Sequence, residues 1–65
     1  MAFWYYSSGS AWLPFDPMSR GQIEMLWRHS TAAWVYVAAF RGPAYINAAA
    51  LYMNYNGISY PIARR

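Results

Sequence analysis

The sequence predicts an α+β fold, in which several antiparallel strands and one helix form a single small domain. Two observations predict this fold class. Several short segments alternate apolar and other residues with a period of two, which is typical of strands with one buried face. One segment in the first half has the i, i+3, i+4 spacing of an amphipathic helix. A helix on one face of a curved sheet buries both apolar surfaces.

The first 15 residues are predicted to form a β-hairpin. Residues 2–6 are mostly aromatic and favour a strand. Residues 7–10 are a cluster of serine and glycine that favours a turn. Residues 11–15 then form the returning strand, because a short turn between two such segments indicates antiparallel pairing.

A helix follows the hairpin, and two start positions fit the pattern. Ser19 with Gln22 three residues later forms a capping box, in which each side chain satisfies a free backbone donor. Asp16 before Pro17 is a rival cap one turn earlier. The pattern alone leaves both starts open.

The predicted helix has one apolar stripe and a charged side. Ile23, Leu26 and Trp27 lie at i, i+3 and i+4 and form a stripe for the core. Glu24 and Arg28 lie off that stripe and form an i,i+4 pair in the favourable orientation.

The second half of the chain is predicted to be strands. In residues 34–40 the even positions, from Trp34 to Phe40, face one side and the odd positions face the other. A turn at residues 41–43 leads to a strand at 44–48, although the alanines at 48–50 also fit a helical turn.

The last predicted hairpin has the strongest short signal in the chain. Asn56-Gly57 separates strands at residues 52–55 and 58–62, and both turn residues tolerate the positive φ of a type I′ turn. Pro61 predicts that the last strand lies at an edge or leaves a donor unpaired.

Size and composition constrain the core. A 65-residue chain forms one domain with a marginal core, and it has no cysteine for disulfides or thiolate zinc sites. Aromatic residues make up 22% of the chain, so we expect large rings to replace such cross-links, with Trp4 and Trp12 in the core. The lack of cysteine is compatible with a cytoplasmic or nuclear location, and the amino terminus has no secretory pattern.

The charge pattern gives weak support for nucleic-acid binding. The net charge is +3 and every cation is an arginine, scattered along the sequence apart from Arg64 and Arg65. Without a dense basic stripe, we expect no specific DNA partner. Residues 42–63 are uncharged, but turn-forming residues interrupt them, so we expect no membrane span.

We expect no catalytic or metal site. Glu24 has Asp16 as its one possible carboxylate partner and no nucleophile pattern, so we interpret it as structural. His29 lies near the predicted helix end as a cap or surface residue, and no second histidine exists to share a metal ion. The chain is therefore predicted to be non-enzymatic and to need no cofactor.

Three motifs stand out in the first half of the chain: Trp4-Tyr5-Tyr6, Trp12 with the following Pro14-Phe15-Asp16-Pro17, and Ile23-Glu24 with Trp27. Together they resemble the WWE domain, a small module named for two tryptophans and a glutamate. In the second half, Tyr45-Ile46-Asn47, Leu51-x-Met53, Asn56-Gly57 and Tyr60-Pro61-Ile62-Ala63-Arg64 occupy family positions with several substitutions.

The resemblance implies a fold and a function. It implies that residues 1–65 form a single WWE-like domain, an antiparallel half-barrel of five to six strands packed on one helix. It also implies a non-catalytic binding module of a larger protein, linked to ubiquitination or ADP-ribosylation. Several members of the family bind the iso-ADP-ribose unit of poly(ADP-ribose), whose phosphates and adenine need donors and aromatic faces.

The resemblance also indicates ligand-binding residues. Tyr6 matches a pocket tyrosine, while Met53 and Tyr60 replace a glutamine and an arginine of the binding members. Arg64 and Arg65 are either a frayed tail or the remnant of the family's basic rim, in which Arg64 would neutralise phosphate. A one-residue shift of the alignment makes Tyr45 the second pocket tyrosine. Leu13, Ala44 and Ala63 replace a tryptophan, a tyrosine and a basic residue.

These substitutions leave a second function open. Tyr6, Leu13, Met53 and Tyr60 would line an apolar pocket, and an exposed apolar patch usually marks a partner surface. The alternative is therefore a protein-interaction or structural module with a degenerate pocket.

Overall fold

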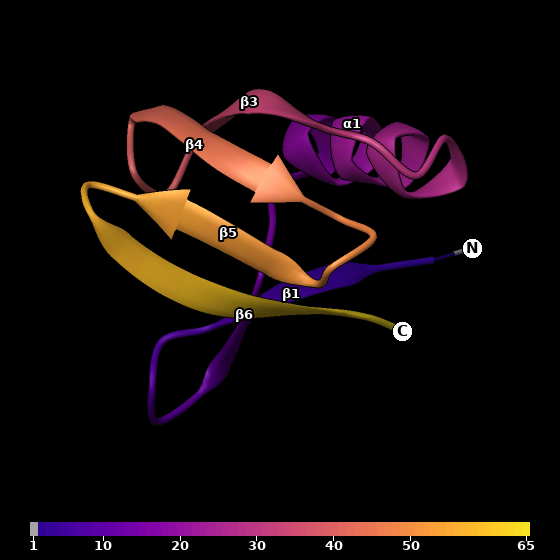
Figure 1. Cartoon of the computed structure of the whole chain (residues 1–65). Helices are drawn as coiled ribbons and strands as arrows, with labels where there is room; N and C mark the ends of the chain where they lie inside the picture. Colours follow the sequence, from indigo (N-terminus) through magenta and orange to yellow (C-terminus); the bar gives the residue numbers. More distant parts are fainter. Residues whose placement is uncertain (1) are drawn as a thin grey trace.

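The fold is a six-stranded antiparallel sheet that curves around one helix. The computed structural model describes residues 2–65. The elements are β1 (Trp4–Ser7), β2 (Trp12–Pro14), α1 (Pro17–Arg28), β3 (Ala32–Val37), β4 (Gly42–Asn47), β5 (Tyr52–Tyr55) and β6 (Ile58–Arg64). The strand order is β2-β1-β6-β5-β4-β3, and α1 packs mainly on β3, with the two chain ends on one side (Figure 1). The predicted α+β half-barrel with five to six strands is confirmed.

The helix begins at the earlier of the two predicted starts. Asp16 is the N-cap, Pro17 follows at the first helical position, and Asp16 Oδ2 accepts from the Ser19 N–H at 3.1 Å. Ser19 is fully buried, and its Oγ lies 2.7 Å from Asp16 Oδ1 and 2.8 Å from the Tyr36 carbonyl oxygen. The Ala38 N–H also donates to Asp16, at 3.2 Å. The cap therefore fastens the helix start to the end of β3.

The core lies between the inner face of the sheet and the helix. Val35 and Val37 point inward, whereas Trp34 and Tyr36 point outward, as the alternation predicts. The strand ends at Val37, three residues earlier than predicted, and Phe40 turns back to pack against the core. The buried apolar residues are Trp4, Tyr6, Phe15, Ile23, Val35, Val37, Ala44, Ile46, Ala48, Met53 and Ile62.

The prediction that Trp12 lies in the core is wrong. Trp4 is fully buried, whereas Trp12 is 50% exposed and Trp34 68% exposed. The reason is strand register: Leu13 pairs with the inward-facing Tyr6, so Trp12, one residue away, faces outward beside Ser7. A three-residue edge strand cannot bury both of its faces.

The last hairpin matches its prediction, but the position of its second strand does not. Asn56 and Gly57 have φ values of 53° and 79°, as a type I′ turn requires. β6 lies between β1 and β5, so the first of the two alternatives predicted from Pro61, an edge strand, is wrong. Pro61 is tolerated because pairing with β1 ends at Ile62, one residue away, and the missing N–H removes no bond of that ladder.

Candidate anion-binding site

A hydrogen bond joins Trp4 and Glu24, two of the residues that carry the sequence resemblance. The Trp4 indole Nε1–H, from β1, donates to Glu24 Oε1, on α1, at 2.8 Å. The indole is fully buried, so it needs a partner for its one polar group. Trp27, one turn further along the helix, packs edge-on against the Trp4 ring at a centroid distance of 6.4 Å.

Glu24 also binds the end of β6. Arg64 donates from Nε to Glu24 Oε1 at 3.0 Å and from Nη2 to Oε2 at 2.8 Å, a two-bond pairing of guanidinium and carboxylate. The Arg64 guanidinium carbon lies 4.0 Å from the centroid of the Trp27 ring. Arg28 Nε lies 3.5 Å from the same carboxylate, as the i,i+4 spacing predicts.

These contacts fix the charge of Glu24. Hydrogen bonds from Arg64 and then from Trp4 lower the pKa of Glu24 from 4.5 to about 2. Glu24 is therefore ionised across the physiological range. An ionised carboxylate with three partners is a poor proton donor, which agrees with its interpretation as structural.

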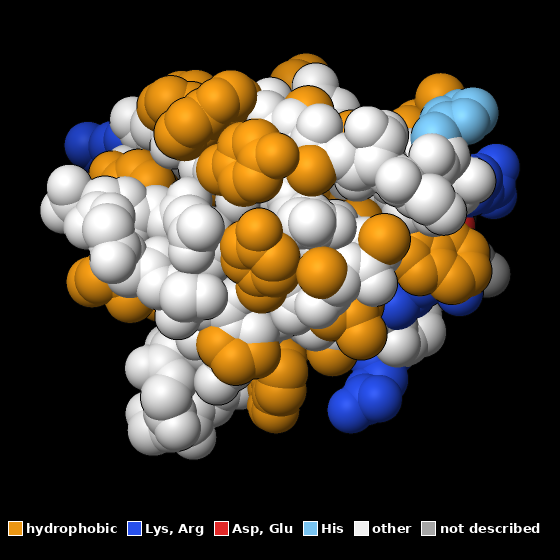
Figure 2. All heavy atoms as spheres, viewed as in Figure 1, with side chains coloured by type: hydrophobic (Ala, Val, Ile, Leu, Met, Phe, Trp, Pro, Cys, Tyr) orange, Lys and Arg blue, Asp and Glu red, His pale blue; other side chains and the backbone are white. Residues whose placement is uncertain are grey.

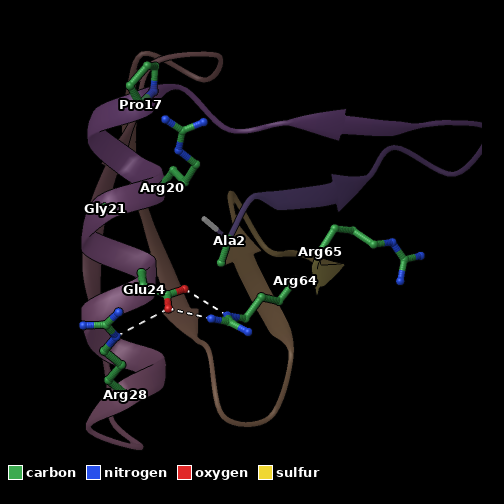
Figure 3. Close-up of a pocket in the computed structure, with 8 residues that line it drawn as sticks. All are labelled: Ala2, Pro17, Arg20, Gly21, Glu24, Arg28, Arg64 and Arg65. Carbon is green, nitrogen blue, oxygen red and sulfur yellow. Dashed lines mark hydrogen bonds and ion pairs between the residues drawn. The ribbon is translucent and has the colours of Figure 1, made fainter.

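A cleft of about 650 Å³ opens beside this ion pair (Figure 3). Its lining residues are Ala2, Pro17, Arg20, Gly21, Glu24, Arg28, Arg64 and Arg65. In Figure 3, Arg64 reaches from β6 toward Glu24, and Arg20 projects from the helix near Pro17. The cleft therefore lies between α1, the start of the chain and the end of β6.

The cleft holds the whole formal side-chain charge of the protein. Four arginines and one glutamate line it, which gives +3, and the net charge of the chain is also +3. The two remaining charged residues, Arg41 and Asp16, cancel each other. The arginines that are scattered in the sequence thus meet at one site in the fold.

Part of this cluster was visible in the sequence. Pro17, Arg20, Gly21, Glu24 and Arg28 are spaced by three or four residues and so share one face of a helix. The other part was not visible. Arg64 reaches the helix only because β6 pairs with β1, and no local pattern predicts that pairing.

The predicted ligand-binding residues do not form one pocket. Tyr6 and Tyr60 pack together at a centroid distance of 6.2 Å, but Tyr6 is only 6% exposed and Met53 is fully buried. Phe40 fills the space beside them, 5.5 Å from both tyrosine rings and stacked on Tyr55 at 4.3 Å. The predicted apolar pocket is therefore packed with the protein's own side chains.

The other two predicted residues lie elsewhere. Tyr45 faces the outer side of the sheet, where it contacts Trp34 at 5.5 Å, because its neighbour Ile46 faces the core. Tyr45 and Tyr6 are thus on opposite faces of the sheet and cannot share a pocket. Arg64 is the one predicted residue that lies in the arginine-lined cleft.

The outer face of the sheet is aromatic and largely uncharged. Trp34 and Tyr36 of β3 are 68% and 60% exposed, and Tyr45 and Tyr52 lie on the neighbouring strands. In the view of Figure 2, apolar side chains lie across the middle of the sheet and the arginines lie at the margins.

Within residues 2–65 there is no group of three His, Cys, Asp or Glu side chains that could hold a metal ion. No helix in that range is long and apolar enough to cross a membrane.

Comparisons with family models, with curated proteins and with solved structures find no match for this chain.

Proposed function

We propose that this chain is a non-catalytic, WWE-like binding module that recognises an ADP-ribose-type ligand by its phosphates. The observation that carries the proposal is the arginine-lined cleft, a space of about 650 Å³ with four arginines among its lining residues. Arginine suits this task because its planar group donates two parallel hydrogen bonds to phosphate oxygens.

The arginines of the cleft differ in how available they are. Arg64 binds Glu24 through two hydrogen bonds. Arg28 is a second, more distant partner of Glu24, with its Nε 3.5 Å from the carboxylate. Within residues 2–65, neither Arg20 nor Arg65 is paired with a carboxylate. The Arg20 guanidinium lies over the Phe3 ring, with its carbon 4.7 Å from the ring centroid. Arg20 and Arg65 can therefore donate to a phosphate without first breaking an ion pair, whereas Arg64 is held in place by Glu24.

The class of ligand comes from combining the cleft with the sequence resemblance. The WWE family supplies the expectation of iso-ADP-ribose or poly(ADP-ribose), and the cleft supplies cations for the phosphates of such a ligand. The site then differs from the one that the resemblance implies, because Arg64 alone is common to both. Such a module would serve ubiquitination or ADP-ribosylation in a larger cytoplasmic or nuclear protein.

Calorimetric titration with iso-ADP-ribose tests this proposal. Replacing Arg20 or Arg65 with glutamine should weaken binding about tenfold or more, because a hydrogen bond to a charged group contributes about 1.5–3 kcal/mol. Arg41→Gln is the matched control, because Arg41 lies outside the cleft, and it should bind as the unmodified protein does. Equal loss in all three variants, or no binding at millimolar ligand, would count against the proposal.

The outer aromatic face supports a second candidate function, a protein-interaction module. Trp34 and Tyr36 are large, exposed and uncharged, and such residues are enriched at the centres of protein interfaces. Sedimentation over a range of concentrations tests self-association through this face. Self-association that is lost in Trp34→Asp would support an interface on this face. A strict monomer at every concentration would exclude self-association through it.

A further inference from the structure

A second groove lies on the outer face of the sheet, close to the end of β6. It has a volume of about 250 Å³ and is lined by Tyr5, Trp12, Ala63 and Arg65. Two of its four lining residues are aromatic, and the fourth is a cation. The residues come from three adjacent strands, β2, β1 and β6, and from the residue that follows β6.

The strand register explains why this groove is open. Tyr5 pairs with Ala63 on one side and with Pro14 on the other, so its neighbours are small or flat. Trp12 lies on the same face, beside Ser7, and remains 50% exposed. On this face the sheet presents the rings of Tyr5 and Trp12. The small side chain of Ala63 stands beside them in place of a third bulky side chain, which leaves the groove open.

Arg65 connects this groove to the arginine-lined cleft. Arg65 is a lining residue of both spaces, and its backbone is fixed by two hydrogen bonds to Phe3, with N···O distances of 2.8 and 2.7 Å. Figure 3 shows Arg64 directed toward the helix and Arg65 directed away from it. The two spaces are therefore neighbours, on either side of the end of β6.

We propose that the groove holds the base of the nucleotide whose phosphates lie in the cleft. The proposal rests on the proposed function, and it makes the ligand a nucleotide with its base on Tyr5 and Trp12. Arg65 then lies between the base and the phosphates. The charge supports this occupant: an apolar groove that ends in an arginine suits a flat, uncharged ring with an anion attached.

The chemistry of the groove predicts weak selectivity among bases. Stacking on aromatic rings tolerates any base, because every base has a π-face. Purines stack more strongly than pyrimidines on area alone, so ADP should bind more tightly than UDP by a few-fold. Pyrophosphate has the anion without a base and should bind more weakly than either.

Titrations with ADP, iso-ADP-ribose and pyrophosphate, followed by NMR, test this inference. ADP represents a free nucleotide and iso-ADP-ribose the repeating unit of the polymer, and both should shift the Trp12 indole N–H signal. Trp12→Ala should weaken ADP binding roughly tenfold, as expected for the loss of one stacked ring, and should leave pyrophosphate binding unchanged. Trp34→Ala is the matched control, since Trp34 is an exposed tryptophan of the same face outside the groove.

The outcomes separate this inference from the proposed function. If pyrophosphate and ADP bind equally and the Trp12 signal does not move, the base site is overturned while the phosphate site stands. If none of the three ligands binds, both proposals fail. Because the indole shift is measured on the unmodified protein, the test does not depend on Trp12→Ala being folded.

Discussion

Trp4 and Glu24 are joined by a hydrogen bond of 2.8 Å, although they lie 20 residues apart in the sequence. The bond connects the first strand to the middle of the helix and is extended to the last strand by Arg64. One carboxylate thus ties together three segments that are distant in sequence. The same carboxylate sets the position of an arginine in the cleft, so stability and the proposed binding site share a residue.

Removing the indole N–H should destabilise the protein. Trp4→Phe deletes the donor to Glu24 and leaves a small cavity, which should lower the free energy of unfolding by about 2–4 kcal/mol. Thermal unfolding measures this as a loss of roughly 10–20 °C in Tm for a domain of this size. Trp34→Phe should change stability by less than about 0.5 kcal/mol, because that ring is largely exposed. Equal losses in the two variants would contradict a specific role for the Trp4 bond.

Acid should weaken the fold through Glu24. Its pKa is about 2 in the folded protein against 4.5 for the free group, so the folded state prefers the ionised form. The resulting stabilisation is present above pH 4.5 and is lost as the pH falls toward 2. Urea unfolding at a series of pH values should therefore show a steeper loss in this window for the unmodified protein than for Glu24→Gln.

Asp16 also contributes to the pH dependence of unfolding, because its pKa is lowered in the folded protein. Burial alone would raise the pKa of Asp16, but hydrogen bonds from Ser19 and from the Ala38 N–H outweigh it and lower the pKa. Because Asp16 titrates in both proteins, only the difference between the two curves reports on Glu24. Parallel curves would show that Glu24 makes no pH-dependent contribution.

Gly21 offers a test in which stability and binding change in opposite directions. It lies in the middle of α1 and lines the cleft, and a Cβ built there meets no atom within 4 Å. Gly21→Ala should stabilise the helix by about 0.5–1 kcal/mol, which thermal unfolding measures. Gly21→Leu would place a larger side chain in the cleft and should weaken iso-ADP-ribose binding in a protein that remains folded. Unchanged affinity in Gly21→Leu would indicate that the ligand does not approach this face of the helix.

Phe40 fills the space beside Tyr6 and Tyr60, where the sequence resemblance implies a pocket, and it does not line the arginine-lined cleft. Its ring packs against Tyr6, Tyr55 and Tyr60, and its removal should cost about 2–4 kcal/mol of stability. If the ligand binds in the arginine-lined cleft, Phe40→Ala should leave its affinity unchanged at a temperature where the variant is folded. A large gain in affinity would instead mean that Phe40 blocks a binding pocket beside Tyr6.

The general fold could be predicted from the sequence because its signals are local. Alternation in β3 separates the buried Val35 and Val37 from their exposed neighbours, and Asn56-Gly57 fixes the last turn. The order of the strands in the sheet could not be predicted from local sequence patterns. β6 lies inside the sheet because it pairs with β1, more than 50 residues away in sequence, and Pro61 by itself left open an edge strand or a missing donor.

The candidate site could be predicted only in part, for the same reason. The helical spacing from Arg20 to Arg28 was visible, but the approach of Arg64 depends on the pairing of β6 with β1. The burial of tryptophan followed from register and not from size, which is why Trp4 is buried and Trp12 is exposed. Composition predicts how much aromatic area a small core needs, and it does not predict which ring supplies it.

Arginine side-chain signals in an NMR titration locate the bound phosphates most directly. With iso-ADP-ribose as the ligand, the Nε–H signals of Arg20, Arg64 and Arg65 should shift together with one dissociation constant, while that of Arg41 stays in place. Shifts confined to the rings of Tyr6, Phe40 and Tyr60, with the arginine signals unmoved, would contradict binding in the arginine-lined cleft.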